Sequence, residues 1–139
     1  MPEPAPVVEI AATVFVPDAG EANKALAADL LQSVFIAGAF DRLGEYFTPD
    51  YVQHNPLIGD GLDGLHTAGA ELAKYHYLSV FKVLGQGDFV MTMSHVTYDG
   101  QDAAVYDLFR MAGGKIVEHW DVLQPIPPES EWKNSNGKF

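Results

Sequence analysis

The second half of the chain contains four runs in which apolar and polar residues alternate, and very short connections rich in glycine separate them. The connections include Asp99-Gly100 and Gly113-Gly114, which favour tight hairpins between antiparallel strands. Alternation with a period of two is typical of strands that have one buried face. We therefore predict an antiparallel meander of four strands, which are Ser79–Leu84, Phe89–Thr97, Ala103–Met111 and Lys115–Gln124.

The first half of the chain has helical patterns instead. The segment Ala22–Ala39 has no proline and is mostly apolar from Leu26 onward, which predicts a long, well-covered helix. We expect a second short helix over Phe40–Phe47, a short strand over Tyr51–His54, and a third helix over Leu65–Tyr75. Helices followed by a meander predict an α+β fold, in which helices pack on the concave face of a curved antiparallel sheet. Such a sheet forms a cone whose open end is an apolar pocket.

The length of the chain, 139 residues, fits one domain. We expect an N-terminal arm over residues 1–18, a single folded domain over 19–128, and a polar C-terminal tail over 129–139. Proline-rich sequence marks the arm, and its apolar run Ile10–Val16 is expected to pack on the domain.

The charge of the chain excludes several classes of partner. The net charge of −11 repels phosphate backbones and anionic lipid surfaces, so neither nucleic acid nor a membrane is an expected partner. The absence of cysteine excludes disulfides and thiolate chemistry. No apolar run approaches the ~20 residues of a membrane span, and the N-terminus lacks the features of an export signal. We therefore expect a soluble, cytoplasmic protein.

Several short motifs together indicate a family. They are Tyr51-Val52-Gln53-His54-Asn55-Pro56, Gly61 with Gly64, Gly87-Asp88, Asp107-Leu108-Phe109-Arg110, and Gly114 to Val122 with its Glu118-His119-Trp120-Asp121 core. From about Ala22 to Pro128, the chain resembles the SnoaL-like polyketide cyclases of the nuclear-transport-factor-2-like superfamily. The resemblance implies a cone-shaped α+β barrel, a homodimer formed through the outer face of the sheet, and no metal or organic cofactor.

The resemblance also implies acid–base chemistry inside the cone. SnoaL closes a polyketide ring by aldol condensation, and Asp121 matches its catalytic acid/base. Ketosteroid isomerases have an Asp base where this chain has Asn55, which cannot ionise. Epoxide hydrolases have an Arg and an Asp where this chain has Met93 and His95, so epoxide hydrolysis is less expected. Their short strand supplies a Tyr and an Asn that hold the attacking water, and here Gln53 and Asn55 occupy those positions.

Strand geometry places the candidate residues. Asp121 lies two residues after His119, so both side chains share one face of the last strand, and Gln53 and Asn55 likewise share a face. His54 has the opposite parity and is expected to point away. A carboxylate inside an apolar cone is poorly solvated, and this can tune it for proton transfer.

Two further residues could complete the site. We predict that His95 pairs with Asp121 across the pocket, from a strand face shared with Met93. If Gly113-Gly114 is a two-residue turn, Tyr106 lies opposite Asp121. A slip of one residue would bring Asp107 and Phe109 into the pocket instead.

The histidines do not have the helical spacing of a zinc site, and the glycine-rich segments lack the arrangement of a phosphate loop. We therefore predict no metal.

Three hypotheses remain open. The first is cofactor-independent acid–base catalysis on a small apolar carbonyl compound, the second a non-catalytic module that binds a hydrophobic small molecule, and the third a dimeric interaction domain whose cone is filled.

Overall fold

The structure is a computed structural model that describes residues 17–139 of the chain. The predicted packing of Ile10–Val16, and most of the predicted N-terminal arm, lie outside the described residues. Within residues 17–139, no helix is both long enough and apolar enough to cross a membrane.

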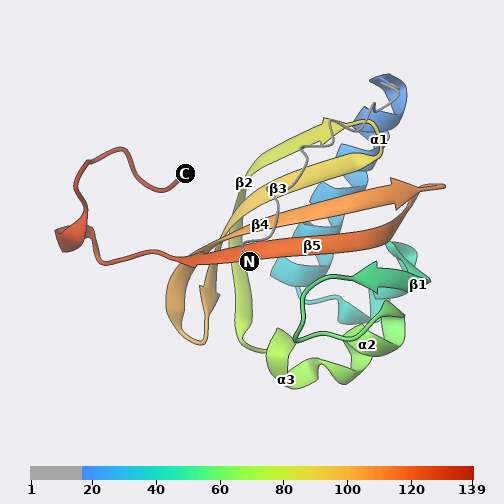
Figure 1. Cartoon of the computed structure of the whole chain (residues 1–139), viewed down its shortest axis with the longest axis horizontal. Coiled ribbons are helices and arrows are strands. Elements are labelled where there is room, and N and C mark those ends of the chain that lie inside the picture. The colour runs from blue at the N-terminus through green and yellow to red at the C-terminus, as the bar shows by residue number, and fades with distance from the viewer. Residues whose placement is uncertain (1–16) are drawn as a thin grey trace, which may run out of the picture.

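A curved, unclosed sheet of five strands, in the order β1-β5-β4-β3-β2, forms one layer of the fold (Figure 1). Its strands are β1 (Phe47–Gln53), β2 (Tyr75–Gln86), β3 (Phe89–Tyr98), β4 (Gln101–Ala112) and β5 (Lys115–Pro125). The three consecutive pairings from β2 to β5 are antiparallel, which confirms the predicted meander. The pairing of β1 with β5 is parallel, so the sheet is mixed rather than wholly antiparallel. An edge strand such as β1 tolerates Pro49, because one side of it needs no ladder hydrogen bonds.

Helices form the second layer. Helix α1 (Pro17–Asp29) continues into the π-helical segment η1 (Leu30–Ile36), and the two cross behind the strands in Figure 1. A 3₁₀ segment, η2 (Phe40–Glu45), follows, and the short helices α2 (Gly61–Thr67) and α3 (Gly69–Leu72) lie beside β1 and near the start of β2. A further 3₁₀ turn, η3 (Glu129–Glu131), lies in the C-terminal tail.

The predicted helix over Leu65–Tyr75 was wrong at its end. Gly69 follows a break between α2 and α3, and Tyr75 already belongs to β2, where it pairs with Tyr98. The pairing of Tyr75 with a strand that lies 23 positions further along overrides its helical spacing, which is a local signal.

The core lies between the helices and the concave face of the sheet. Leu30 and Val34 from η1 pack there with Val90, Phe109 and Ile116 from three strands, and all five side chains are buried. These apolar side chains therefore lie next to the inward-facing residues of β4 and β5.

A β-bulge at Val117 sets which residues of the last hairpin face inward. Ala112 pairs with Lys115 across the predicted two-residue turn, but Arg110 pairs with Glu118, so Val117 is an extra residue. The bulge lets Ile116 and His119 face the same way although they are three residues apart. Every later pairing is displaced by one position from that of a regular hairpin.

The loop that precedes α2 makes a very close backbone contact with that helix. A Cβ atom on Gly64 would lie 1.9 Å from the carbonyl oxygen of Gly59. Any residue other than glycine at position 64 would therefore push this loop away, and the same loop carries Asn55 and Ile58.

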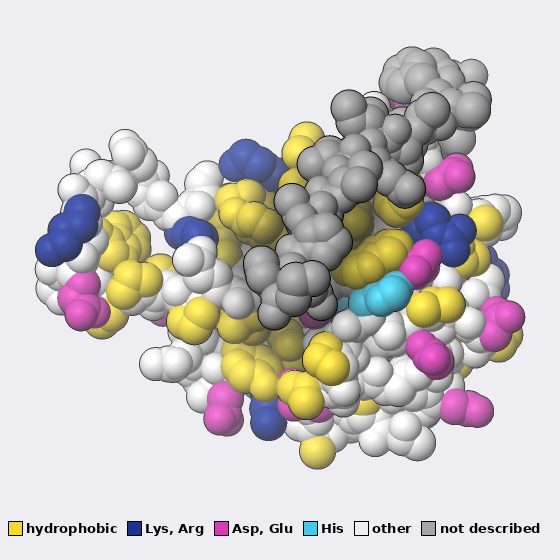
Figure 2. Space-filling view, viewed as in Figure 1, with side chains coloured by type: hydrophobic (Ala, Val, Ile, Leu, Met, Phe, Trp, Pro, Cys, Tyr) yellow, Lys and Arg dark blue, Asp and Glu magenta, His cyan; other side chains and the backbone are white. Residues whose placement is uncertain are grey.

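The C-terminal tail crosses to the outer face of the sheet. The ring of its last residue, Phe139, stacks on Phe81 of β2 with a centroid distance of 4.5 Å. Figure 2, which looks onto this side, shows hydrophobic side chains gathered over the strands. Among the exposed apolar residues of the strands are Phe81, Tyr106 and Val122.

Candidate active site

A cavity lies between the concave face of the sheet and the helices. Its free volume of about 40 Å³ has room for a few water molecules or a small organic group. Most of its lining is apolar, and the polar groups converge from β1, β2, β4 and β5. The lining residues are Leu31, Phe35, Phe47, Gln53, Ile58, Leu65, Leu72, Tyr75, Tyr77, Asp107, Phe109, His119 and Asp121.

Asp121 lines this cavity from β5, as predicted. The side-chain nitrogen Nδ2 of Asn55 donates to both of its carboxylate oxygens at 3.2 Å. Burial raises the pKa of the Asp121 carboxyl, His119 opposes this effect, and the neighbouring Asp107 adds to it. Asp121 is thus a partly desolvated carboxylate that one amide holds in place.

Asn55 is fixed by the turn in which it lies. Its side-chain oxygen accepts a hydrogen bond from the backbone N–H of Leu57 at 3.0 Å, and its side chain is buried. The same residue therefore makes the turn and points its amide nitrogen at the carboxylate of Asp121.

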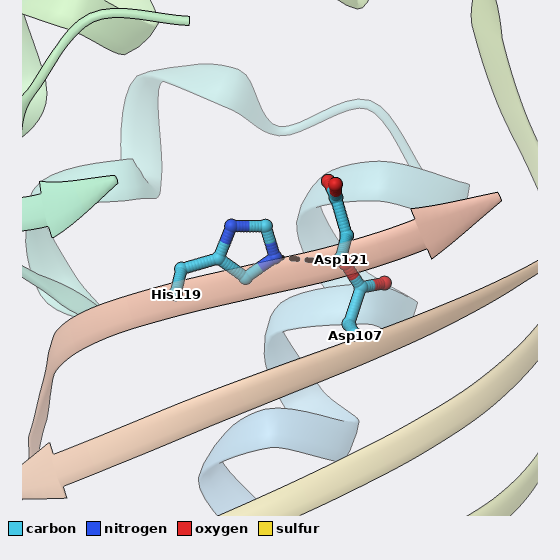
Figure 3. A group of neighbouring side chains, drawn as sticks. All are labelled: Asp107, His119 and Asp121. Atoms are coloured by element: carbon cyan, nitrogen blue, oxygen red, sulfur yellow. Dashed lines mark hydrogen bonds and ion pairs between the residues drawn. The ribbon is translucent and has the colours of Figure 1, made fainter. Parts of the chain in front are cut away.

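His119 and Asp107 form a buried pair beside Asp121 (Figure 3). Nε2 of His119 lies 2.8 Å from Oδ1 of Asp107, and Nδ1 lies 2.8 Å from the side-chain oxygen of Gln53. The hydroxyl of Tyr77 donates to the other oxygen of Asp107 at 2.7 Å. A continuous hydrogen-bonded chain therefore runs from β1 through β5 and β4 to β2.

Two tyrosine hydroxyls of β2 border the same cavity. Burial raises the pKa of Tyr75, and the negative charge of Asp121 adds to the effect. Burial likewise raises the pKa of Tyr77 well above its usual range, and the charge of Asp107 adds to the effect. Both hydroxyls keep their protons at neutral pH and can act as hydrogen-bond donors.

Tyr106 is not in the site, and Asp107 takes the expected place. Asp107 pairs with Asp121 and Phe109 pairs with His119, while Tyr106 pairs with Val122 on the outer face. The prediction that Tyr106 opposes Asp121 assumed a hairpin without a bulge, and the extra residue Val117 produces the one-residue slip.

His95 and Met93 also lie on the outer face. The buried positions of β3 are Val90, Thr92, Ser94 and Val96, so the residues that alternate with them point away from the cavity. His95 pairs through Nε2 with Asp102 at 2.9 Å instead of with Asp121. The predicted pairing across the pocket is therefore wrong, because the shared face of β3 was assigned to the wrong side of the sheet.

His54 points away from the cavity, as its parity predicts. Its Nε2 lies 2.6 Å from Glu118, and its ring stacks on Trp120 at a centroid distance of 4.6 Å. Arg110 donates to the other oxygen of Glu118 at 2.8 Å. This outer cluster ties the end of β1 to β5.

The sequence interpretation missed Tyr75 and Tyr77 and left Asp107 as an alternative. Tyr75 and Tyr77 are separated by two positions, which is a strand signal, but the third helix was expected to include Tyr75. Asp107 was available as the product of a one-residue slip, and no feature of the sequence marked Val117 as a bulge.

Asp107, His119 and Asp121 are close enough for their ligand atoms to surround one small ion, since these atoms all lie within 4.8 Å of one another. They come from two neighbouring strands, β4 and β5. However, Nε2 of His119 already binds Asp107, and Asn55 binds both oxygens of Asp121. These hydrogen bonds account for the cluster with protons alone, so we assign no metal to it.

A comparison with models of known families identifies the family of this chain. The model of the SnoaL-like domain family matches residues 27–119, which is more than half of the chain. This chain therefore belongs to the SnoaL-like domain family. The match ends two residues before Asp121.

Solved structures share the fold at low sequence identity. A provisionally assigned ketosteroid isomerase from Kribbella flavida DSM 17836 is 15% identical with a TM-score of 0.67, and the match covers 86% of this chain and 93% of that one. A provisionally assigned SnoaL-like polyketide cyclase from Jannaschia sp. CCS1 is 20% identical with a TM-score of 0.62, with coverages of 75% and 86%. An NTF2-like protein of unknown function from Cytophaga hutchinsonii ATCC 33406 is 13% identical with a TM-score of 0.61, with coverages of 73% and 89%. No curated protein matches the chain by sequence. At these identities the neighbours show the fold alone.

Proposed function

We propose that the protein catalyses cofactor-independent acid–base chemistry on a small apolar carbonyl compound, of the aldol type, with Asp121 as the acid/base. The observation that carries this proposal is a partly desolvated carboxylate which Asn55 orients in an apolar cavity. A carboxyl group whose pKa is raised by burial accepts and returns protons near neutral pH more readily than an exposed one.

The reaction transfers one proton from a substrate carbon to Asp121 and then from Asp121 to a substrate oxygen. Asp121 removes a proton from the carbon next to a carbonyl group, and the electron pair of that C–H bond forms an enolate. The enolate carbon attacks a second carbonyl carbon, so that a C–C bond forms while the C=O π bond breaks and leaves its electron pair on oxygen. The protonated Asp121 then returns its proton to this oxygen, which restores the carboxylate. Tyr75 borders the cavity and keeps its own proton, so it can donate a hydrogen bond to the carbonyl oxygen.

The size of the cavity favours a small substrate. Its free volume of about 40 Å³ is far below the 300–1,000 Å³ that is typical of sites for drug-sized ligands. A substrate with several rings would require Phe35, Leu72 or Ile58 to move aside. Small ketones and diketones are therefore the compounds to test first.

The test measures proton removal directly. The protein is incubated in D₂O with a panel of small methyl and cyclic ketones, and ¹H NMR follows deuterium incorporation next to the carbonyl. We expect Asp121→Asn to lower the catalysed exchange by about 10²-fold or more, because a general base contributes ~10²–10⁴ in rate. The matched control is Asp88→Asn, which alters an exposed carboxyl in the turn between β2 and β3 and should leave the rate unchanged.

A second candidate function is the binding of a hydrophobic small molecule without turnover. The apolar lining and small volume of the cavity favour it equally well. A ligand that raises the melting temperature of both the wild-type protein and Asp121→Asn, with no exchange by either, would support binding and contradict the catalytic proposal.

We further propose that the protein is a cytoplasmic homodimer that associates through the outer face of the sheet. The exposed apolar side chains of this face support the proposal, and Val122 is 66% exposed. Light scattering coupled to size exclusion should give the mass of a dimer, and Val122→Glu should give that of a monomer. A monomeric wild-type protein would refute this assembly.

A further inference from the structure

The side-chain amide of Gln53 can adopt one orientation only. Its oxygen accepts a hydrogen bond from the backbone N–H of Asn55 at 3.0 Å, and its nitrogen donates to the hydroxyl of Tyr51 at 3.1 Å. A backbone N–H is always a donor, so the opposite orientation would direct two N–H groups at each other.

This orientation fixes one proton on His119. Nδ1 of His119 lies 2.8 Å from the same oxygen of Gln53, which can only accept. Nδ1 must therefore carry a hydrogen. If the ring were neutral, this hydrogen would be its only one, and Nε2 would carry a lone pair.

A second proton is then required between His119 and Asp107. Nε2 of His119 lies 2.8 Å from Oδ1 of Asp107, while the hydroxyl of Tyr77 donates to Oδ2. With a bare Nε2 and an ionised Asp107, two lone pairs would face each other at hydrogen-bond distance in a buried site. Asp107 is 2% exposed and His119 is 8% exposed, so water cannot relieve that repulsion.

We propose that Asp107 and His119 hold one proton between them, so that the pair is neutral overall and Asp121 is left as the one net negative charge among the described residues that line the cavity. The pair holds this proton whether or not the protein is an enzyme, but its effect on turnover rests on the proposed function. Without the shared proton, Asp121 would lie beside a second carboxylate within 4.8 Å, and this like charge would disfavour the ionised form that must remove the proton. Asp107 and His119 are positioning residues, because they act through Asp121.

The groups that can influence Asp121 come from five elements. Besides the amide of Asn55, they are the hydroxyl of Tyr51 on β1, Asp107 on β4, His119 on β5, Glu71 on α3, and the hydroxyls of Tyr75 and Tyr77 on β2. The carboxylate of Glu71 is already bound to Tyr98 and Lys74. The substitutions that test the proposal therefore change the charge of the Asp107–His119 pair.

Asp107→Asn distinguishes a pair that shares one proton from an ionised Asp107 beside a neutral His119. An asparagine keeps the shape of Asp107 and can donate to Nε2 of a neutral His119, so the pair stays neutral. If wild-type Asp107 shares the proton, the titration midpoint of Asp121 in ¹³C NMR should not move in this variant. If wild-type Asp107 is a free carboxylate beside a neutral ring, the variant removes a negative charge, and the midpoint must fall.

His119→Gln gives the complementary result. It leaves Asp107 ionised and without its partner, so the midpoint of Asp121 should rise. Should this variant fail to fold, the ring nitrogens of the wild-type protein still decide the matter. In ¹⁵N NMR at neutral pH, we expect either both nitrogens of His119 protonated, or Nδ1 alone protonated together with a protonated Asp107 carboxyl in the ¹³C spectrum.

Several results would overturn the proposal. They are a bare Nδ1 on His119, a neutral ring beside an ionised Asp107, a falling midpoint in Asp107→Asn, and a stoichiometric divalent metal ion in the purified protein by mass spectrometry. None of these measurements depends on turnover. If the protein catalyses no exchange but the NMR spectra show the shared proton, only the proposed function fails. If exchange depends on Asp121 but the shared proton is not found, only this proposal fails.

Discussion

The contact between Gly59 and Gly64 gives a sharp test of how the loop beside the cavity is held, since the neighbouring Ile58 and Leu65 line that cavity. Substitution of Gly64 with Ala would place a Cβ atom 1.9 Å from the carbonyl oxygen of Gly59, and 2.9 Å from its Cα. Ordinary contacts of a Cβ begin near 3.4 Å, so one backbone segment must move by 3.4 − 1.9 = 1.5 Å. No side-chain rotation can relieve a clash with backbone atoms.

The expected cost lies at the upper end of the range for overpacking, about 3 kcal/mol. For a chain of this length, that corresponds to a fall in melting temperature of roughly 10 °C. The matched control is Gly69→Ala, because a Cβ on Gly69 meets nothing within 4 Å. This control should gain about 0.5 kcal/mol, since alanine restricts the unfolded chain more than glycine does.

The assay is urea denaturation of the three proteins, followed by circular dichroism. Gly64→Ala should also weaken the hold on Asp121, because the displaced loop carries Asn55. An NMR titration of Asp121 in the same variant would show this second effect. If Gly64→Ala were within about 0.5 kcal/mol of the wild type, or if Gly69→Ala lost as much stability, the explanation of this loop by a close backbone approach would be wrong.

Three other substitutions test the charges and the core. Burial raises the pKa of Asp121 in the folded protein, so the protonated carboxyl stabilises the fold at low pH, and this stabilisation is lost as the pH rises through the pKa of the folded state. Asp121→Asn should therefore have a larger free energy of unfolding than the wild type at pH 7. The difference should vanish near pH 3.5. Hydrogen bonds lower the pKa of Glu118, the one from His54 more than the one from Arg110. Ionised Glu118 therefore stabilises the fold at neutral pH, and this stabilisation is lost as the pH falls. Denaturation curves of Glu118→Gln and the wild type should converge on acidification. Thr92 has a buried hydroxyl without a partner among residues 17–139, so Thr92→Val should raise stability by about 1 kcal/mol in urea denaturation, and a loss would show that the hydroxyl is satisfied.

The sequence predicted the four strands of the meander well because their alternation and their tight turns are local signals. The period of two, and turns such as Gly113-Gly114, defined β2 to β5 to within a few residues at most ends. The shared face of Asp121 and His119 followed from their spacing, and the resemblance to the SnoaL-like cyclases placed that face in the cavity. These features need only neighbouring residues to be decided.

Two parts of the site were beyond such reasoning for physical reasons. Which side of β3 faces the helices depends on long-range packing, so His95 and Met93 were assigned to the cavity although they lie outside it. The position of a β-bulge depends on the twist of the whole sheet, so the sequence could offer both Tyr106 and Asp107 but could not choose between them.

The irregular registers of this sheet have a consequence for how such proteins diversify. Pairing shifts occur in β1, in β2 and at Val117, and each bends its strand and adds to the curvature of the sheet. The shape of the cavity thus depends on where the ladder is interrupted, while Asp107, His119 and Asp121 lie on regularly paired stretches. A gain or loss of one strand residue elsewhere in the sheet would therefore reshape the cavity without replacing these side chains.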